Sequence, residues 1–308
     1  WVGEPVSIAA PVCLEFRRSG GQNLLLVGQE SDLADSIFAA SILSWCTKST
    51  AGSNQYAPRM TFVHDGRDAE SLRKFESTFT TSRTHEFQLR KAPEVDSVIT
   101  QLFQEMTARE NGDIPHDAPE ILLAIRNLGQ FRTLRREEDD FGMGAFGSSK
   151  AVTAASMLGD LIRKGPLVGI HVMIWADTFS NAMRWLSNSL LREFDTRIAF
   201  RLNQTDSASL IDTPAASSLS QGRAILYRDQ TGSADRFRPF SWPSEEWLKT
   251  LTGDHEADEA TTVLASAAGT ASRTVVEKPA NSAKQVQPPG NPDIPPDDQL
   301  SIDDIVIE

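Results

Sequence analysis

The residues with the clearest chemical potential follow the apolar run Asn23–Gly28, where a strand would lead into a helix. A phosphate-binding loop at such a turn reads G-x-x-x-x-G-K-[ST]. Its glycines let backbone N–H groups surround the phosphates, its lysine neutralises their charge and its hydroxyl binds Mg²⁺. If Gly28 is the first glycine, the other three motif positions fall on Leu33, Ala34 and Asp35. Only the first glycine matches, so the sequence predicts a degenerate nucleotide site.

Carboxylates gather around the same turn. Glu30, Asp32 and Asp35 lie where the triphosphate of a nucleotide would sit. Such carboxylates stabilise the N-terminus of a helix, and they also repel phosphate groups. We therefore expect no cofactor, and ATP with Mg²⁺ would bind only if the degenerate site is functional. The two cysteines and five histidines have no metal-ligand spacing, so we expect no metal site.

A second motif of an ATP-hydrolysing site is missing as well. It consists of an apolar run followed by an aspartate that holds Mg²⁺, and often by a glutamate. Here the apolar run Ile121–Ile125 is followed by Arg126 and Asn127. A guanidinium group has only donors and cannot bind a cation. Because two separate motifs are lost together, we expect an inactive site without catalytic residues.

Three other residues are candidates for a binding role. Asp177 follows the predicted strand Gly169–Trp175 and is the best-placed carboxylate for a residual site, although capping of the next helix is the interpretation we favour. Arg197 and Arg201 lie four positions apart in the predicted strand Arg197–Leu202 and should share a face. They are candidates for an arginine finger or an interface contact, and surface arginines in salt bridges are the alternative.

These positions must be held by a sheet with helices on its faces. Short apolar runs alternate with helical patterns, which predicts an α/β fold with a doubly wound, mainly parallel sheet. The last two runs have no helix between them and predict an antiparallel edge hairpin. The predicted strands are Asn23–Gly28, Met60–Asp65, Ile121–Ile125, Gly169–Trp175, Arg197–Leu202, Arg223–Tyr227 and Arg236–Phe240. The predicted helices are Ser31–Cys46, Val95–Glu110, Thr153–Lys164 and Asn181–Glu193.

Composition divides the chain of 308 residues into a domain, 1–252, and an acidic tail, 253–308. The tail is rich in alanine, serine, proline and acidic residues and predicts disorder. Its last residues, Leu300–Glu308, regain apolar character and are either a peptide that docks on a protein or a frayed terminus. The absence of a disulfide framework indicates a reducing compartment, the cytoplasm. No apolar run is long enough to cross a membrane, and the net charge of −12 gives only weak attraction to polyanions.

The C-terminal half resembles the motor domain of FtsK/SpoIIIE-type ATPases of the HerA/FtsK group. Val168–Ile174 (VGIHVMI) resembles the strand that reads AVGIHLI in that family, and Thr196–Leu202 (TRIAFRL) resembles its TRIAFRV strand. Asp206–Asp212 and Leu219–Tyr227 resemble the next two segments in the same order. The resemblance covers about Val6 to Trp247. It implies a RecA-like P-loop NTPase fold, in which Asp177 takes the place of the family's sensor glutamine.

The resemblance and the broken motifs together imply a degenerate C-terminal copy of such a module. It would hydrolyse no ATP by itself and would act in assembly, regulation or partner binding. Its expected partners are other ATPase modules of the same chain or ring, with DNA or a protein that docks the C-terminal tail as further candidates. Two alternatives remain open: an active ATP-dependent DNA translocase module, and a protein-substrate receptor module of a secretion-type ATPase.

Overall fold

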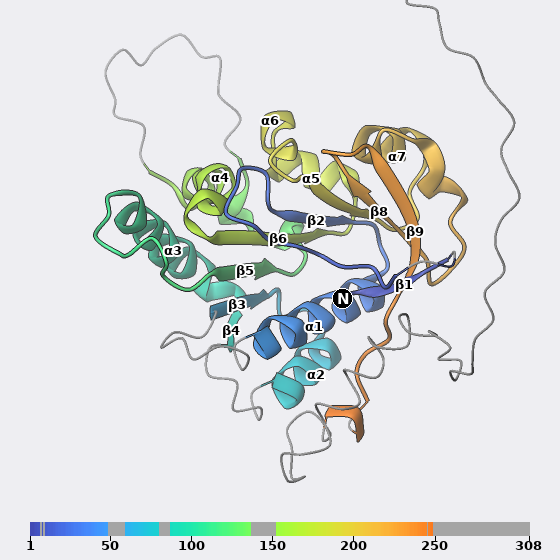
Figure 1. The fold of residues 1–308 in the computed structure, drawn as a ribbon, viewed down its shortest axis with the longest axis horizontal. Coiled ribbons are helices and arrows are strands. Elements are labelled where there is room, and N and C mark those ends of the chain that lie inside the picture. Colours follow the sequence, from blue (N-terminus) through green and yellow to red (C-terminus); the bar gives the residue numbers. More distant parts are fainter. Residues whose placement is uncertain are drawn as a thin grey trace, which may run out of the picture. The chain divides into compact units, whose positions relative to one another are not determined.

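The computed structural model in Figure 1 describes residues 1–6, 8, 10–48, 59–79, 87–136, 152–244 and 246–248, with only the backbone at 46–48. The chain divides into two units, residues 1–256 and 257–308. The tail that the sequence predicts, 253–308, lies outside the described residues. Of the helices described, none is long and apolar enough to span a bilayer.

A single mixed sheet forms the centre of the first unit. In the described part of the chain its order is β1-β9-β8-β7-β2-β6-β5-β3-β4. The strands from β7 to β4 in this order run parallel, whereas β8, β9 and β1 pair antiparallel. The strands are β1 Gly3–Pro5, β2 Leu24–Val27, β3 Arg59–His64, β4 Phe87–Lys91, β5 Ile121–Ile125, β6 Ile170–Ala176, β7 Thr196–Ala199, β8 Ala224–Arg228 and β9 Ser233–Pro239.

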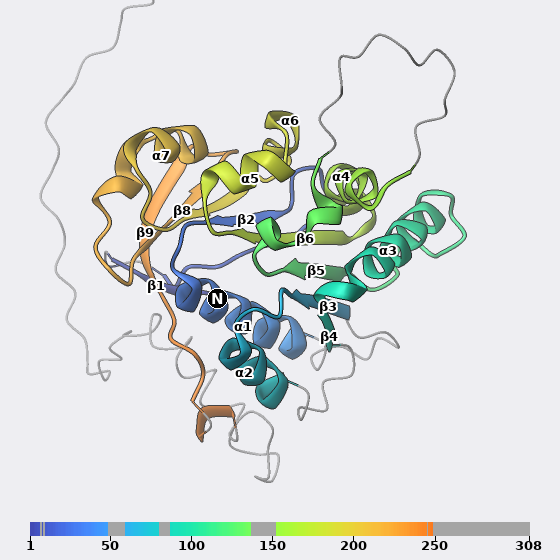
Figure 2. The same ribbon diagram turned by 180° about the vertical axis from the view of Figure 1, so that it is seen from behind.

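Helices cover both faces of this sheet (Figures 1 and 2). Helices α1 and α2 pack on one face, and α3 to α7 pack on the other. The helices are α1 Ser31–Lys48, α2 Ala69–Phe79, α3 Val95–Glu110, α4 Ala154–Lys164, α5 Phe179–Trp185, α6 Asn188–Leu191 and α7 Gln204–Ile211. Short 3₁₀ turns occupy Ala92–Glu94, Leu128–Gln130, Arg132–Leu134, Gly165–Val168 and Pro214–Ser218.

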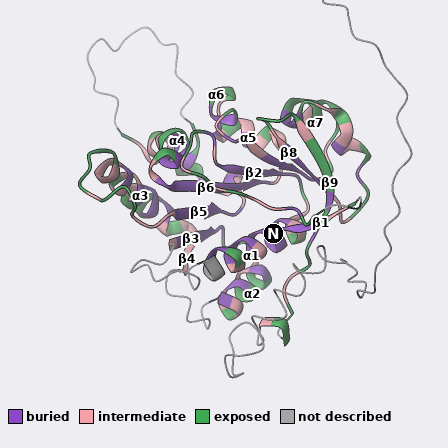
Figure 3. Cartoon of the chain, viewed as in Figure 1, coloured by how far each residue is buried: buried purple, intermediate pink, exposed green. Residues whose placement is uncertain are grey.

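Burial on both faces explains why the central strands are apolar throughout. Every residue of β2, β5 and β6 is buried (Figure 3). Alternate side chains enter opposite cores: Leu24 and Leu26 pack towards α1 and α2, whereas Leu25 and Val27 pack towards α3 to α7. The prediction of an α/β fold with a mainly parallel sheet is therefore confirmed.

The edges of the sheet differ from the prediction. The last two strands do pair antiparallel, but they are not the edge, because β1 pairs with the outer side of β9. The opposite edge, β4, and the helix α2 before it were not predicted. The predicted helix Asn181–Glu193 is two helices, since Leu186 is extended (φ −103°, ψ 137°) and Ser187 caps α6.

Candidate functional site

Gly28 makes a sharp turn at the carboxyl end of β2, as a phosphate loop would require. Its φ of +135° lies in the region that favours glycine, and a Cβ there would come within 2.6 Å of Phe200 Cβ. The Glu30 side chain lies against this turn, with Oε2 buried and 3.1 Å from the position of that Cβ. A carboxylate thus faces the turn where phosphate would approach a working loop.

The lysine position of the motif lies inside the core. Ala34 is fully buried against the other residues between α1 and the sheet, and Leu33 packs against the same cluster. The Ala34 N–H donates to the Glu30 carbonyl at 3.0 Å, so it forms part of the first turn of α1. This segment therefore supplies neither the cation nor the open backbone that a triphosphate needs.

Two further motif positions, Asp35 and Arg126, bind each other. Arg126 Nε donates to Asp35 Oδ1 at 2.7 Å, and Nη2 donates to Asp35 Oδ2 at 3.0 Å. The arginine is 2% exposed and the aspartate 6%, so this is a buried, bidentate ion pair. It joins α1 to the end of β5, the two elements that hold Mg²⁺ between them in a working site.

Two more carboxylates and an aromatic ring complete the surroundings of Arg126. Nη1 donates to Asp65 Oδ1 at 3.0 Å, and Nη2 lies 3.4 Å from Asp68 Oδ2. The guanidinium carbon lies 5.3 Å from the centre of the Trp175 ring, whose N–H donates to the Gly28 carbonyl. Burial alone would lower the pKa of Arg126, but the hydrogen bond to Asp35 and the three negative charges outweigh it and raise that pKa.

A buried histidine extends the cluster to α2. The Gly66 N–H donates to His64 Nδ1 at 2.9 Å, so Nδ1 carries no proton. The other ring nitrogen, Nε2, lies 3.2 Å from Ser71 Oγ. The Ser71 hydroxyl donates in turn to Asp35 Oδ2 at 2.7 Å. Burial and then the charge of Arg126 lower the pKa of His64, so the imidazole is neutral at pH 7.

These residues do not fit Mg²⁺-ATP. A guanidinium stands where a carboxylate would hold the metal, and both oxygens of the Asp35 carboxylate already accept hydrogen bonds from Arg126 or Ser71. No group of three or more histidine, cysteine or acidic residues suited to a metal occurs in the described ranges. Of the three carboxylates expected near a triphosphate, Asp35 is paired with Arg126, whereas Glu30 and Asp32 remain at the turn.

Asn127 and Asp177 follow neighbouring strands but do not join this cluster. Asn127 has a left-handed backbone (φ 58°), and its carbonyl accepts from Gln130 N–H at 3.0 Å. The helix after β6 is capped by Thr178, which accepts from Asn181 N–H. Asp177 Oδ1 instead accepts from the Asn181 side-chain amide at 2.7 Å. The interpretation of Asp177 as the cap was therefore wrong by one residue.

Arg197 and Arg201 do not share a face, because β7 ends at Ala199. Arg197 is 5% exposed and donates to the carbonyls of Phe194 and Leu210 at 3.0 and 3.1 Å. It also pairs with Asp229 at 3.2 Å, so it connects segments of its own domain. Arg201 is exposed beyond the end of the strand.

The sequence predicted the motif positions of this site, from Gly28 to Asp35 and at Arg126 and Asn127, but not the residues that surround Arg126. Asp65, next to His64, is the last residue of the predicted strand Met60–Asp65. A carboxylate at the carboxyl end of a strand could have been predicted as a site residue. Asp68 and Ser71 were missed together with α2. The pairing of β6 with β2 places Trp175 beside the turn at Gly28, and no local motif predicts that contact.

Comparisons with solved structures agree with the fold of the chain. No protein-family model matches the chain, and no curated protein sequence does. The cytoplasmic domain of the Thermomonospora curvata type VII secretion ATPase EccC superposes with a TM-score of 0.55 at 17% identity, over 83% of this chain and 31% of that one. A second solved structure, described as an ATPase, gives 0.52 at 12% identity, over 79% and 87%. The chain thus spans about a third of the EccC chain, and it has the α/β fold of P-loop ATPases.

Proposed function

We propose that this chain is a non-hydrolysing module with the fold of a P-loop ATPase, of the FtsK/SpoIIIE-like kind, that acts in assembly, regulation or partner binding. One observation carries the proposal: Arg126 and Asp35 neutralise each other at the two positions that would hold Mg²⁺. Both positions thus form an ion pair within the chain. Other ATPase modules, in the same chain or in a ring, are its proposed partners.

Measurement of phosphate release tests this proposal. The full chain with Mg²⁺-ATP, alone and with double-stranded DNA, should release phosphate no faster than a buffer blank. DNA-stimulated release would instead favour the alternative of an active DNA translocase and would contradict the proposal. A third assay adds an active ATPase module from the same complex and measures phosphate release by that module. A change in the turnover of that partner, without turnover by this chain, is the result expected of a regulatory module.

A protein-substrate receptor is a second candidate function. The likeness to the cytoplasmic domain of a secretion ATPase favours it, although it rests on fold alone. We also propose that residues 1–252 form the domain and 253–308 a tail that docks on a protein. Deletion of 253–308 followed by partner pull-down distinguishes binding by the tail from binding by the domain. A partner held by the tail is lost, and one held by the domain is retained.

A further inference from the structure

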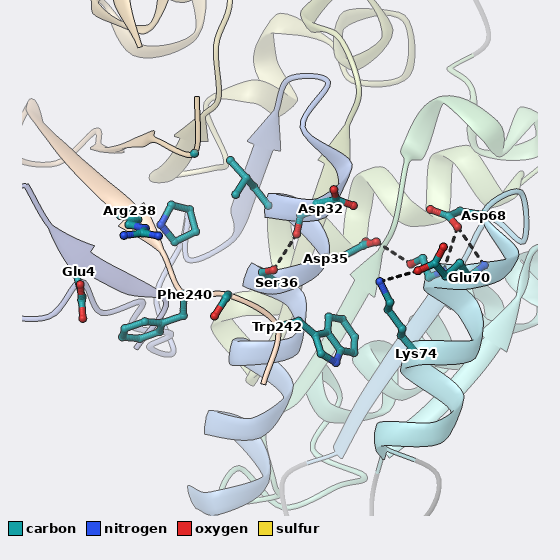
Figure 4. A pocket seen from close by; sticks show the side chains of 15 residues that line it. Glu4, Asp32, Asp35, Ser36, Asp68, Glu70, Lys74, Arg238, Phe240 and Trp242 are labelled. Atoms are coloured by element: carbon teal, nitrogen blue, oxygen red, sulfur yellow. Dashed lines mark hydrogen bonds and ion pairs between the residues drawn. The ribbon is translucent and has the colours of Figure 1, made fainter. Parts of the chain in front are cut away.

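A cavity of about 720 Å³ opens beside the Arg126 cluster. It lies between the first turns of α1, helix α2 and the segment Arg238–Trp242 at the end of β9 (Figure 4). This volume is in the range of sites that hold a small ligand or several side chains. Several rim residues are exposed, among them Asp32, Glu70 and Phe240, so a polypeptide can approach the opening.

One wall of the cavity is aromatic and held in place by packing. The Trp242 ring meets Phe75 edge-on, with 4.8 Å between centroids, and lies 6.3 Å from Phe79. Phe240 lines the same cavity and is 36% exposed. Aromatic faces attract cations, and Arg126 over Trp175 already illustrates this contact in the neighbouring cluster.

The other walls carry more negative than positive charge. Glu4, Asp32, Asp35, Asp68 and Glu70 line the cavity together with only two cations, Lys74 and Arg238.

Arg126 satisfies Asp35 and also contacts Asp68, and Lys74 pairs with Glu70 at 3.0 Å on the open surface. Asp32 has no ion-pair partner within the described part of the chain. Five carboxylates against two cations give the described lining a net negative charge, which disfavours an anion and attracts a cation.

We propose that this cavity binds a basic segment of a partner protein, with a lysine or arginine side chain placed against Trp242 and the carboxylates of α1 and α2. The inference deepens the proposed function, on which it rests, by naming the chemistry of the partner. An ammonium or guanidinium group would pair with Asp32 and share Glu70 with Lys74, and its alkyl stem would cover Trp242. A neutral apolar ligand would leave Asp32 without a counter-ion.

Fluorescence anisotropy with a fluorescein-labelled hexa-arginine peptide tests the inference on the full chain. The pocket variant Asp32→Asn with Glu70→Gln should weaken binding by about tenfold, the effect of losing one or two charge pairs. The matched control Asp113→Asn with Asp117→Asn removes the same charge from the exposed segment after α3 and should change binding less than about twofold. Trp242→Leu should weaken binding without a change of charge.

Equal weakening in the pocket and control variants would overturn the inference, because it would mean attraction to net charge alone. Full displacement of the peptide by equimolar spermidine would also overturn it, in favour of a small polyamine ligand. Urea unfolding of each variant confirms that the fold is retained. If the peptide fails to bind while the chain still hydrolyses no ATP, the inference falls and the proposed function stands.

Discussion

At the scale of residues, Arg126 puts a cation where a working ATPase would need a metal ligand. It pairs with three carboxylates: Asp35 on α1, and Asp65 and Asp68 in the connection between β3 and α2. Such a buried pair depends on both partners, since either one alone would be an uncompensated charge. Asp35 and Arg126, which stand at the hydroxyl and aspartate positions of the two motifs, therefore depend on each other for charge compensation.

Loss of Arg126 should destabilise the domain strongly. Arg126→Met leaves buried carboxylates without their cation and should lower the free energy of unfolding by about 3–5 kcal/mol, measured by urea denaturation. Arg132→Met, in an exposed turn, is the control and should stay within about 0.5 kcal/mol. The double variant Asp35→Leu, Arg126→Met should cost less than the two single changes added together. Strict additivity would show that the two residues do not interact.

His64 should make the domain sensitive to acid. Its pKa is lowered in the folded state, so below the ordinary value of about 6.5 the unfolded chain binds a proton that the folded chain does not. Stability is thus fully present above that value and falls as the pH drops through it, by up to about 1.4 kcal/mol per pH unit. Urea unfolding at several pH values between 7.5 and 5 should show this slope in the wild type. It should be reduced in His64→Gln but not in the exposed control His116→Gln.

At the scale of elements, the accuracy of prediction follows the strength of the local pattern. The sequence predicted α3 and β5 to the residue, because α3 repeats its apolar positions every four residues and β5 is a continuous apolar run. The edge strand β4 was missed since it reads FQLRK and has no buried residue. In the site, the motif frame located Gly28, Asp35 and Arg126. Asp68 and Trp175 join them only through tertiary contacts that no local pattern encodes.

The N-cap of α5, at the carboxyl end of β6, can be tested by mutation. Thr178 accepts from the backbone N–H of Asn181, whereas Asp177 accepts from the side chains of Asn181 and Thr178 and from no backbone group in the described part of the chain. Thr178→Ala should therefore cost about 1 kcal/mol of unfolding free energy, as loss of a helix cap does. Asp177→Ala should cost clearly less in the same urea titration. The reverse order would restore Asp177 as the cap.

At the scale of the whole molecule, the chain has the fold of an ATPase, and Asp35 and Arg126 bind each other at the edge of the sheet where nucleotide would bind. The sheet still brings the ends of β2, β5 and β6 to one edge, where such a fold binds nucleotide. The acidic cavity beside that edge is lined by Asp32 and Trp242. Its charge suits a basic ligand rather than a nucleotide.

Calorimetric titration of Mg²⁺-ATP into the full chain tests the central claim most directly. With Ala34 at the lysine position and Arg126 bound to Asp35, we predict no binding heat at nucleotide concentrations up to the millimolar range. A saturable isotherm with micromolar affinity that requires Mg²⁺ would contradict the account, because it would mean that the ion pair opens and the metal takes its place.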